Sequence, residues 1–197
     1  MRQISAELIG ALFGDGSVCK HDYEIRISLG KKDKEYANYL AYLLTNLGLK
    51  PKIDIKRTNE IWIRVWNKIF WLEICKWFRP GKKFIKKIPK NMKEFIKGIF
   101  DTDGSVHLDK RKYPVISIRS SDEKILRKIQ KYLSGLEITS SLFGPETTPF
   151  GGTVYKLRVY GIKNCKKWLE KIGSSNPRKR EILENALQSD HTVRGES

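Results

Sequence analysis

The chain has 197 residues, 40% of them hydrophobic, which suits one domain of two halves or two small domains. Its 39 lysines and arginines outnumber its 22 acidic residues, giving a formal net charge of +17. This excess, spread along the chain, favours nucleic acid as a partner over an anionic membrane surface. No apolar run reaches the roughly 20 residues of a membrane helix. The N-terminal run contains Glu7, Gly10 and Gly14, unlike a signal peptide.

The hydrophobic pattern of the first half predicts a helix, two strands, a helix, two strands and a helix. Ser5 is the expected N-cap of the first helix, and we expect Gly16 to end it in the left-handed conformation. In the strands, apolar residues alternate with polar ones, and Ile53 and Ile55 are assigned to the apolar face. The predicted elements are a helix to about Gly14, strands at 18–20 and 24–29, a helix from Asp33 to about Leu47, strands at 51–57 and 60–66, and a helix at 67–78.

A basic connector with two prolines, residues 79–91, precedes a second half in which the same order starts again. The predicted elements there are a helix at 92–103, strands at 105–109 and 114–119, a helix from Ser121 or Asp122 to about Leu133, strands at 138–143 and 153–160, and helices at 162–172 and 177–188. The sequence thus predicts an α+β fold made by duplication of an α-β-β-α-β-β-α unit. The halves are residues 1–78 and 92–188, with a disordered tail at 189–197.

One stretch occurs twice and organises both halves. Leu-Ile-Gly-Ala-Leu-Phe-Gly-Asp-Gly at 8–16 corresponds to Ile-Lys-Gly-Ile-Phe-Asp-Thr-Asp-Gly at 96–104, and Ser-Val follows each copy. Small residues four positions apart leave one helix face without side-chain spacers, so the two helices can approach closely. The expected helix interface is Gly10, Gly14, Gly98 and Thr102.

The two stretches end in Asp15 and Asp103, which are 88 positions apart. If the helices pack on each other, these carboxylates meet at the negative ends of two helix dipoles and repel unless a cation lies between them. Oxygen ligands suit hard divalent ions, Mg²⁺ above all. A single Asp-Gly is more simply a helix C-cap turn, but two copies with matching flanks favour a metal site. The cysteines, Cys19, Cys75 and Cys165, are far apart and indicate buried thiols in a reducing compartment rather than a zinc ribbon or a disulfide framework.

With this motif pair and repeated element order, residues 4–188 resemble the LAGLIDADG homing endonucleases in their single-chain, two-motif form. The resemblance implies two antiparallel sheets that form a DNA-binding saddle, with the motif helices at the interface between the halves. It assigns the metal to Asp15 and Asp103, together with Gly14 and Thr102 before them. At the sixth motif position the first copy has Phe13 where the family has an acid, whereas the second has Asp101; that position is not the metal ligand.

The resemblance also implies a ring of basic and polar residues around the metal. Lys83 and Lys179 follow the third helix of each half, where a catalytic-pocket lysine is common in the family, although either is also compatible with a solvated charge. Lys31, Lys32, Arg119 and Ser120 precede the second helix of each half.

The polar strand faces provide the expected DNA-binding set, because a two-stranded ribbon fits the major groove and basic side chains read guanine edges there. An ordinary solvated face is the alternative. Trp62 and Trp66 argue against it unless they pack under a helix. The full set is Lys20, Arg26, Ser28, Lys31, Lys32, Lys52, Lys56, Trp62, Arg64, Trp66, Ser117, Arg119, Ser120, Thr139, Ser141, Lys156, Arg158 and Tyr160.

The resulting hypothesis is a monomeric, site-specific homing endonuclease that makes a staggered double-strand break with 3′ overhangs in a long, weakly palindromic DNA target. We expect Mg²⁺ as cofactor, Mn²⁺ as a substitute, and Ca²⁺ to bind without supporting cleavage. The alternatives are an intron-encoded maturase that binds its host intron RNA and a DNA-binding regulator that does not cleave. An intein is disfavoured because the chain starts directly at the endonuclease. We expect no membrane partner, and a location in the cytoplasm or an organellar matrix, with DNA, rather than secretion.

Overall fold

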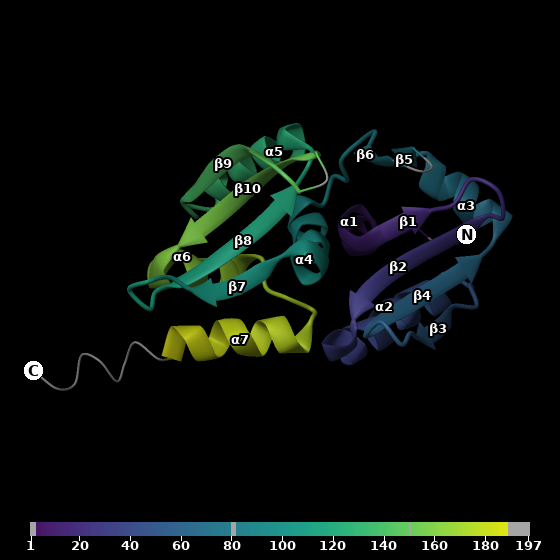
Figure 1. Ribbon diagram of the computed structural model, residues 1–197, viewed down its shortest axis with the longest axis horizontal. Coiled ribbons are helices and arrows are strands. Elements are labelled where there is room, and N and C mark those ends of the chain that lie inside the picture. The colour runs from purple at the N-terminus through teal and green to yellow at the C-terminus, as the bar shows by residue number, and fades with distance from the viewer. Residues whose placement is uncertain (1–2, 80–81, 150, 189–197) are drawn as a thin grey trace, which may run out of the picture. The chain divides into compact units, whose positions relative to one another are not determined.

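The computed structural model describes residues 3–79, 82–149 and 151–188 (Figure 1). The chain forms two compact units, residues 1–102 and 103–197. Each contains one four-stranded antiparallel sheet, and the strands follow the same order in both, the first paired with the second, the second with the fourth and the fourth with the third. The predicted α+β duplication is confirmed.

The first sheet has one buried and one open face. Alternation places Ile25, Ile27, Ile61 and Ile63 on the buried face, which α2 covers (Figure 1). Tyr36 and Leu40 of α2 are also fully buried. The elements of this unit are α1 (Ala6–Asp15), β1 (Gly16–Val18), β2 (Glu24–Gly30), a 3-10 turn (Lys31–Asp33), α2 (Lys34–Asn46), β3 (Lys52–Ile55), β4 (Glu60–Trp66), α3 (Lys68–Cys75), β5 (Phe78–Arg79), β6 (Lys82–Ile85) and α4 (Met92–Asp103), whose last residue belongs to the second unit.

The second unit repeats the pattern around Ile116, Ile118, Leu157 and Val159, which are all buried. Helices α5 and α6 pack on β8 and β10, and α7 packs on β7 and on α6. The elements are β7 (Ser105–Leu108), β8 (Pro114–Ser120), α5 (Glu123–Gly135), β9 (Ser140–Thr147), β10 (Thr153–Tyr160), α6 (Gly161–Lys171) and α7 (Pro177–Gln188). None of the described helices is long and apolar enough to cross a membrane.

At the two ends of α1, one expectation from the sequence is confirmed and the other is wrong. Ser5 is the N-cap of α1, its Oγ accepting a hydrogen bond from the Leu8 amide. Gly16 was assigned wrongly to the left-handed region, since its φ of −85° and ψ of 151° are extended. A glycine is needed there for another reason: a Cβ would lie 2.2 Å from the carbonyl oxygen of Leu12.

Two further findings concern the edge strand β3 and the connector. Ile53 and Ile55 pair with Ile63 and Ile61 and so lie on the apolar face as expected, but they remain 39% and 58% exposed because β3 is the edge strand. At the connector (79–91), β5 and β6 pair as antiparallel strands, Phe78 with Ile85 and Arg79 with Lys82. Residues 189–197, expected to be a disordered tail, lie outside the described residues.

The repeat and the compact units divide the chain at different places. The element order restarts at α4, after the connector, whereas the first unit extends to Thr102 because α4 packs on α1.

Candidate functional site

Helices α1 and α4 approach each other through glycine. A Cβ on Gly10 would lie 2.2 Å from the carbonyl oxygen of Phe95, and one on Gly98 would lie 2.1 Å from the carbonyl oxygen of Glu7. No side chain fits at either place, so the backbones of the two repeated helices are in direct contact. This contact lies wholly within the first unit.

The other two small residues occupy related places. Gly14 is buried, and Thr102 is half-buried with its hydroxyl donating to the carbonyl oxygen of Gly98 at 2.9 Å. The aromatic rings of Phe13 and Phe95 pack beside the contact, with centroids 6.1 Å apart. At the sixth motif position, therefore, the first copy contributes packing where the family has an acid.

The acids of the motifs differ in exposure. Asp15 ends α1 and is half-buried, whereas Asp103 ends α4 and is exposed. Asp101, the sixth-position acid of the second copy, is only 1% exposed. Each of Asp15 and Asp103 thus presents a carboxylate at the carboxyl end of a helix, where the backbone carbonyls also point outward.

Sequence reasoning missed a buried charge network between the same two helices. Glu7 is 3% exposed, lies 3.3 Å from the ammonium of Lys97, and accepts a hydrogen bond from the Tyr39 hydroxyl at 2.9 Å. Burial lowers the pKa of Lys97, but Glu94 and Glu7 raise it by a larger amount, so its net pKa lies above its ordinary value. The network connects α1, α2 and α4, and no local sequence signal marks it.

A second missed group is Tyr36 of α2. Its side chain is fully buried and its hydroxyl makes no hydrogen bond with the described residues. Burial raises the pKa of Tyr36 well above its ordinary value, and the negative charges of Asp101, Glu7 and Asp15 add to the effect. This phenol therefore stays protonated beside the acidic ends of the motif.

The two predicted pocket lysines are placed differently. Lys179 of α7 is 5% exposed, and its Nζ donates a hydrogen bond of 2.6 Å to the carbonyl oxygen of Gly104, the residue after Asp103. Asn176 holds the start of α7, its Oδ1 accepting from the Lys179 amide at 3.4 Å. The backbone of Lys83 lies in β6, while its side chain is outside the described part of the structure.

The open face of the first sheet gathers cations around two tryptophans. The Arg26 guanidinium and the Lys56 ammonium each lie 4.3 Å from the centre of the Trp62 ring. Arg64 lies 4.8 Å from the Trp66 ring, and Trp66 is 45% exposed. The tryptophans therefore do not pack under a helix.

The second sheet has a corresponding face. Arg158 lies 5.3 Å from the Phe143 ring and donates to the Tyr160 hydroxyl at 3.3 Å, while Lys156 pairs with Glu146. Lys156 stands opposite Arg119 in the register of β10 and β8. Phe143 was not predicted, although it follows Ser141 by two positions in the same strand and so shares its face.

The remaining predicted contacts vary in accessibility. Ser117 lies on the open face of β8 but is only 4% exposed, so its hydroxyl is poorly accessible. Thr139 is exposed just before β9, and its amide donates to the Asn164 side chain. The others are at least partly exposed, namely Lys20, Ser28, Lys31, Lys32, Lys52, Ser120 and Ser141.

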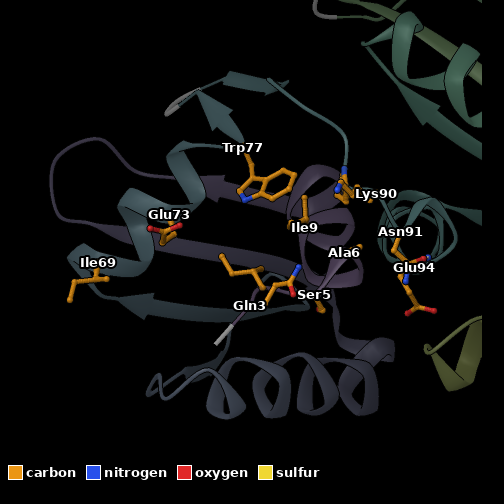
Figure 2. Close-up of a pocket in the computed structure, with 12 residues that line it drawn as sticks. Gln3, Ser5, Ala6, Ile9, Ile69, Glu73, Trp77, Lys90, Asn91 and Glu94 are labelled. Atoms are coloured by element: carbon orange, nitrogen blue, oxygen red, sulfur yellow. The ribbon is translucent and has the colours of Figure 1, made fainter. Parts of the chain in front are cut away.

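A cavity of about 820 Å³ lies in the first unit, and its lining includes Glu94, the second partner of Lys97. Figure 2 shows it between the start of α1, α3 and the start of α4, with Ile9 and Trp77 on one side and Lys90, Asn91 and Glu94 on another. Neither a motif acid nor a residue of the open sheet face lines it. We assign it no role in the chemistry.

The donor chemistry fits a hard divalent cation better than zinc. Within the ranges that the structure describes, no three His, Cys, Asp or Glu side chains are grouped for metal binding. Each of Asp15 and Asp103 by itself offers a helix-terminal carboxylate next to backbone carbonyls, and all of these donors are oxygen. When bound, such a cation would polarise a phosphate and stabilise charge on its oxygens.

Two repeats of a helix followed by paired hairpins, with each repeated helix ending in an acid, define the LAGLIDADG class. Residues 2–75 and 90–173 match the LAGLIDADG-like domain, and the chain belongs to this family. Its sequence identity to the individual proteins described next is below 25%.

Among relatives, the chain is 24% identical to the replicative DNA helicase DnaB of Rhodothermus marinus, over 89% of the chain and 21% of that protein. It is also 24% identical to protein MJ0398 of Methanocaldococcus jannaschii, over 92% of the chain and 70% of that protein. The tRNA-splicing ligase RtcB of Methanopyrus kandleri is 24% identical over 85% of the chain, which spans 20% of the ligase. The chain thus spans about a fifth of DnaB and of RtcB.

Among solved structures, the homing endonuclease I-DmoI in complex with DNA and Ca has a TM-score of 0.61 and 22% identity, covering 92% of this chain and 97% of that one. Full-length DUF199/WhiA from "Thermatoga maritima" has a TM-score of 0.62 and 19% identity, covering 98% of this chain and 66% of that one. At these identities the likeness shows a shared fold.

Proposed function

We propose that this protein is a metal-dependent, site-specific DNA endonuclease that makes a staggered double-strand break in a long, weakly palindromic target. The observation that carries the proposal is the acid that ends each of the two repeated helices, Asp15 in α1 and Asp103 in α4. A protein that only bound nucleic acid would need neither carboxylate. The nearby buried Lys179, held on the Gly104 carbonyl, adds a positive charge beside Asp103.

Different residues have different roles in this proposal. Asp15 and Asp103 would hold Mg²⁺, or Mn²⁺ in its place, and the cation would supply the charge that polarises the scissile phosphate. The two open sheet faces bind the DNA duplex through arginine, lysine and aromatic side chains, in the major groove. I-DmoI structures contain DNA with Ca, Mn or Mg, which supports divalent metal chemistry on this fold.

The first test is cleavage of a DNA library. The wild-type protein is incubated with a randomised duplex pool and Mg²⁺, and cut ends are sequenced. We expect one long preferred site cut on both strands with 3′ overhangs. Asp15→Asn and Asp103→Asn should abolish the double-strand break but retain binding to the recovered site in Ca²⁺. Full cleavage by both variants would contradict the assignment of Asp15 and Asp103 to the catalytic site.

A DNA-binding protein without nuclease activity is the second candidate. The fold is as similar to DUF199/WhiA as it is to I-DmoI, so the fold alone does not select cleavage. For this candidate, selecting the same DNA pool by binding in Ca²⁺ recovers a preferred site, but incubation with Mg²⁺ or Mn²⁺ gives no cut ends, and the two Asn variants bind like the wild type.

A further inference from the structure

Two arginines on the open face of the first sheet are direct cross-strand neighbours with different surroundings. Arg26 of β2 stands opposite Arg64 of β4 in the antiparallel register. Like charges directly opposite each other destabilise a sheet. Compensating one of the two charges would remove this repulsion.

Arg64 is the compensated member. Its Nε donates to Asp54 Oδ2 at 2.8 Å, its Nη2 donates to the same oxygen, and its Nη1 lies 3.9 Å from Glu24 Oε2. The hydrogen bond from Arg64 is the main cause that lowers the pKa of Asp54, so this acid is ionised at neutral pH. Two carboxylates thus hold the guanidinium and reduce its attraction for phosphate.

Arg26 has no such partner. Among the described residues, no carboxylate lies within ion-pair distance of it and no hydrogen bond uses its guanidinium, whose Nε is buried without a partner. It is held instead by Trp62, 4.3 Å away. The indole is itself positioned by a 2.9 Å hydrogen bond from its Nε1 to Glu60. Since β4 lies between β2 and β3, Lys56 reaches Trp62 from the opposite side.

We propose that Arg26 is the base-reading arginine of this sheet, with guanine as its target, and that Asp54 and Glu24 withhold Arg64 from the DNA phosphates. An arginine presents two parallel donors that match guanine O6 and N7, the commonest specific contact in the major groove. Holding Arg64 in the Asp54–Arg64–Glu24 cluster removes a phosphate contact that a non-specific complex would otherwise make, whereas the selected complex keeps the guanine contact of Arg26. The cluster therefore weakens non-specific binding more than specific binding. This inference rests on the proposed DNA binding, but not on cleavage.

The test compares variants by DNA binding alone. Fluorescence anisotropy measures the affinity of the wild type, Arg26→Gln and Asp54→Asn for the selected site, for each of its single-base substitutions, and for shuffled DNA, at two salt concentrations. Arg57→Gln is the matched control, because it removes one exposed positive charge from the adjacent turn. Thermal melts followed by circular dichroism verify that each variant is folded.

For Arg26→Gln we expect the preference for guanine to fall about ten- to a hundredfold at one or two adjacent positions, with little change on shuffled DNA. Asp54→Asn should bind shuffled DNA more tightly, with a salt slope steeper by about one, and the ratio of specific to shuffled binding should fall. Arg57→Gln should weaken both kinds of DNA alike.

Three outcomes would overturn the inference. Equal weakening of specific and shuffled DNA by Arg26→Gln would make Arg26 a phosphate contact. Loss of discrimination at a single cytosine in Asp54→Asn would make Asp54 itself a base reader. If the wild type selects no site at all, the proposed function fails and this inference fails with it, whereas a bound site that is never cut removes only the nuclease proposal.

Discussion

Gly10 of α1 faces the backbone of Phe95 in α4 so closely that a β-carbon at Gly10 would lie 2.2 Å from the Phe95 carbonyl oxygen. Gly98 has the reciprocal relationship with Glu7, at 2.1 Å. Because the obstacle in each case is backbone rather than a flexible side chain, the contact cannot adapt without moving a helix. The glycines therefore define the distance between α1 and α4 within the first unit.

We predict that Gly10→Ala and Gly98→Ala each lower the free energy of unfolding by about 1–3 kcal/mol, as overpacking does, despite the better helix propensity of alanine. Gly135→Ala is the control, since Gly135 ends α5 with nothing within 4 Å of its would-be Cβ. It should be neutral or stabilise by up to about 1 kcal/mol. Urea denaturation followed by circular dichroism measures all three, and wild-type stability in Gly10→Ala would contradict the contact.

The buried pair of Glu7 and Lys97 gives a second prediction. Replacing Glu7 by Gln should cost about 1–3 kcal/mol of unfolding free energy, because a charge-assisted hydrogen-bond partner is lost from a buried site. The same measurement on Lys97→Met and on the double variant completes a double-mutant cycle. Simple additivity of the two effects would show that the pair is not coupled.

The contribution of Lys97 should also depend on pH in one direction. The pKa of Lys97 in the folded protein is above its ordinary value of 10.5, so folding favours the protonated form. Its stabilisation is complete below the unfolded-state value and is lost as pH rises through the folded-state value. The stability difference between the wild type and Lys97→Met should therefore be constant around neutral pH and shrink in alkaline solution; a difference that grows there would refute the assignment.

Features with a local signature could be predicted from the sequence. Alternation in Ile25–Leu29 and Ile61–Val65 defined the strands and their buried faces, and Ser5 marked the start of α1. The doubled Gly-containing stretch indicated a close helix contact, which the structure places at Gly10 and Gly98.

Features that depend on partners far away in the sequence could not be predicted. Glu7 looked like an acid that interrupts an apolar run, because its partners Tyr39 and Lys97 come from other helices. The cations of the first sheet were predicted as a set, but only the register of β3 and β4 shows that Asp54 reaches Arg64. The lysines, glycine and two prolines of the connector form no alternating strand pattern, so the pairing of β5 with β6 was not predicted.

A fourth prediction concerns Lys179. Its buried ammonium holds the Gly104 carbonyl next to Asp103, so Lys179→Met should reduce DNA cleavage about 10²- to 10⁴-fold while retaining binding to the target. Arg180→Gln is the matched control, because Arg180 is exposed on the same helix and pairs with Glu184 one turn further along. Single-turnover cleavage and anisotropy are measured at a temperature where both variants are folded. Cleavage at the wild-type rate in Lys179→Met would remove the residue from the proposed site.

The last prediction uses the reactivity of the three cysteine thiols to test how well the core of the second unit is closed. Burial raises the pKa of Cys165 to about 12, and its Sγ donates to the carbonyl oxygen of Pro114 at 3.4 Å. Near neutral pH only a very small fraction is thiolate, the reactive form. Cys19 and Cys75 are half-exposed. Iodoacetamide should thus alkylate these two in the native protein and reach Cys165 only in guanidinium chloride, as read by peptide mass spectrometry. Alkylation of all three thiols at similar rates in the native protein would mean that α6 separates readily from β8, because the Cys165 side chain of α6 contacts Pro114 of β8.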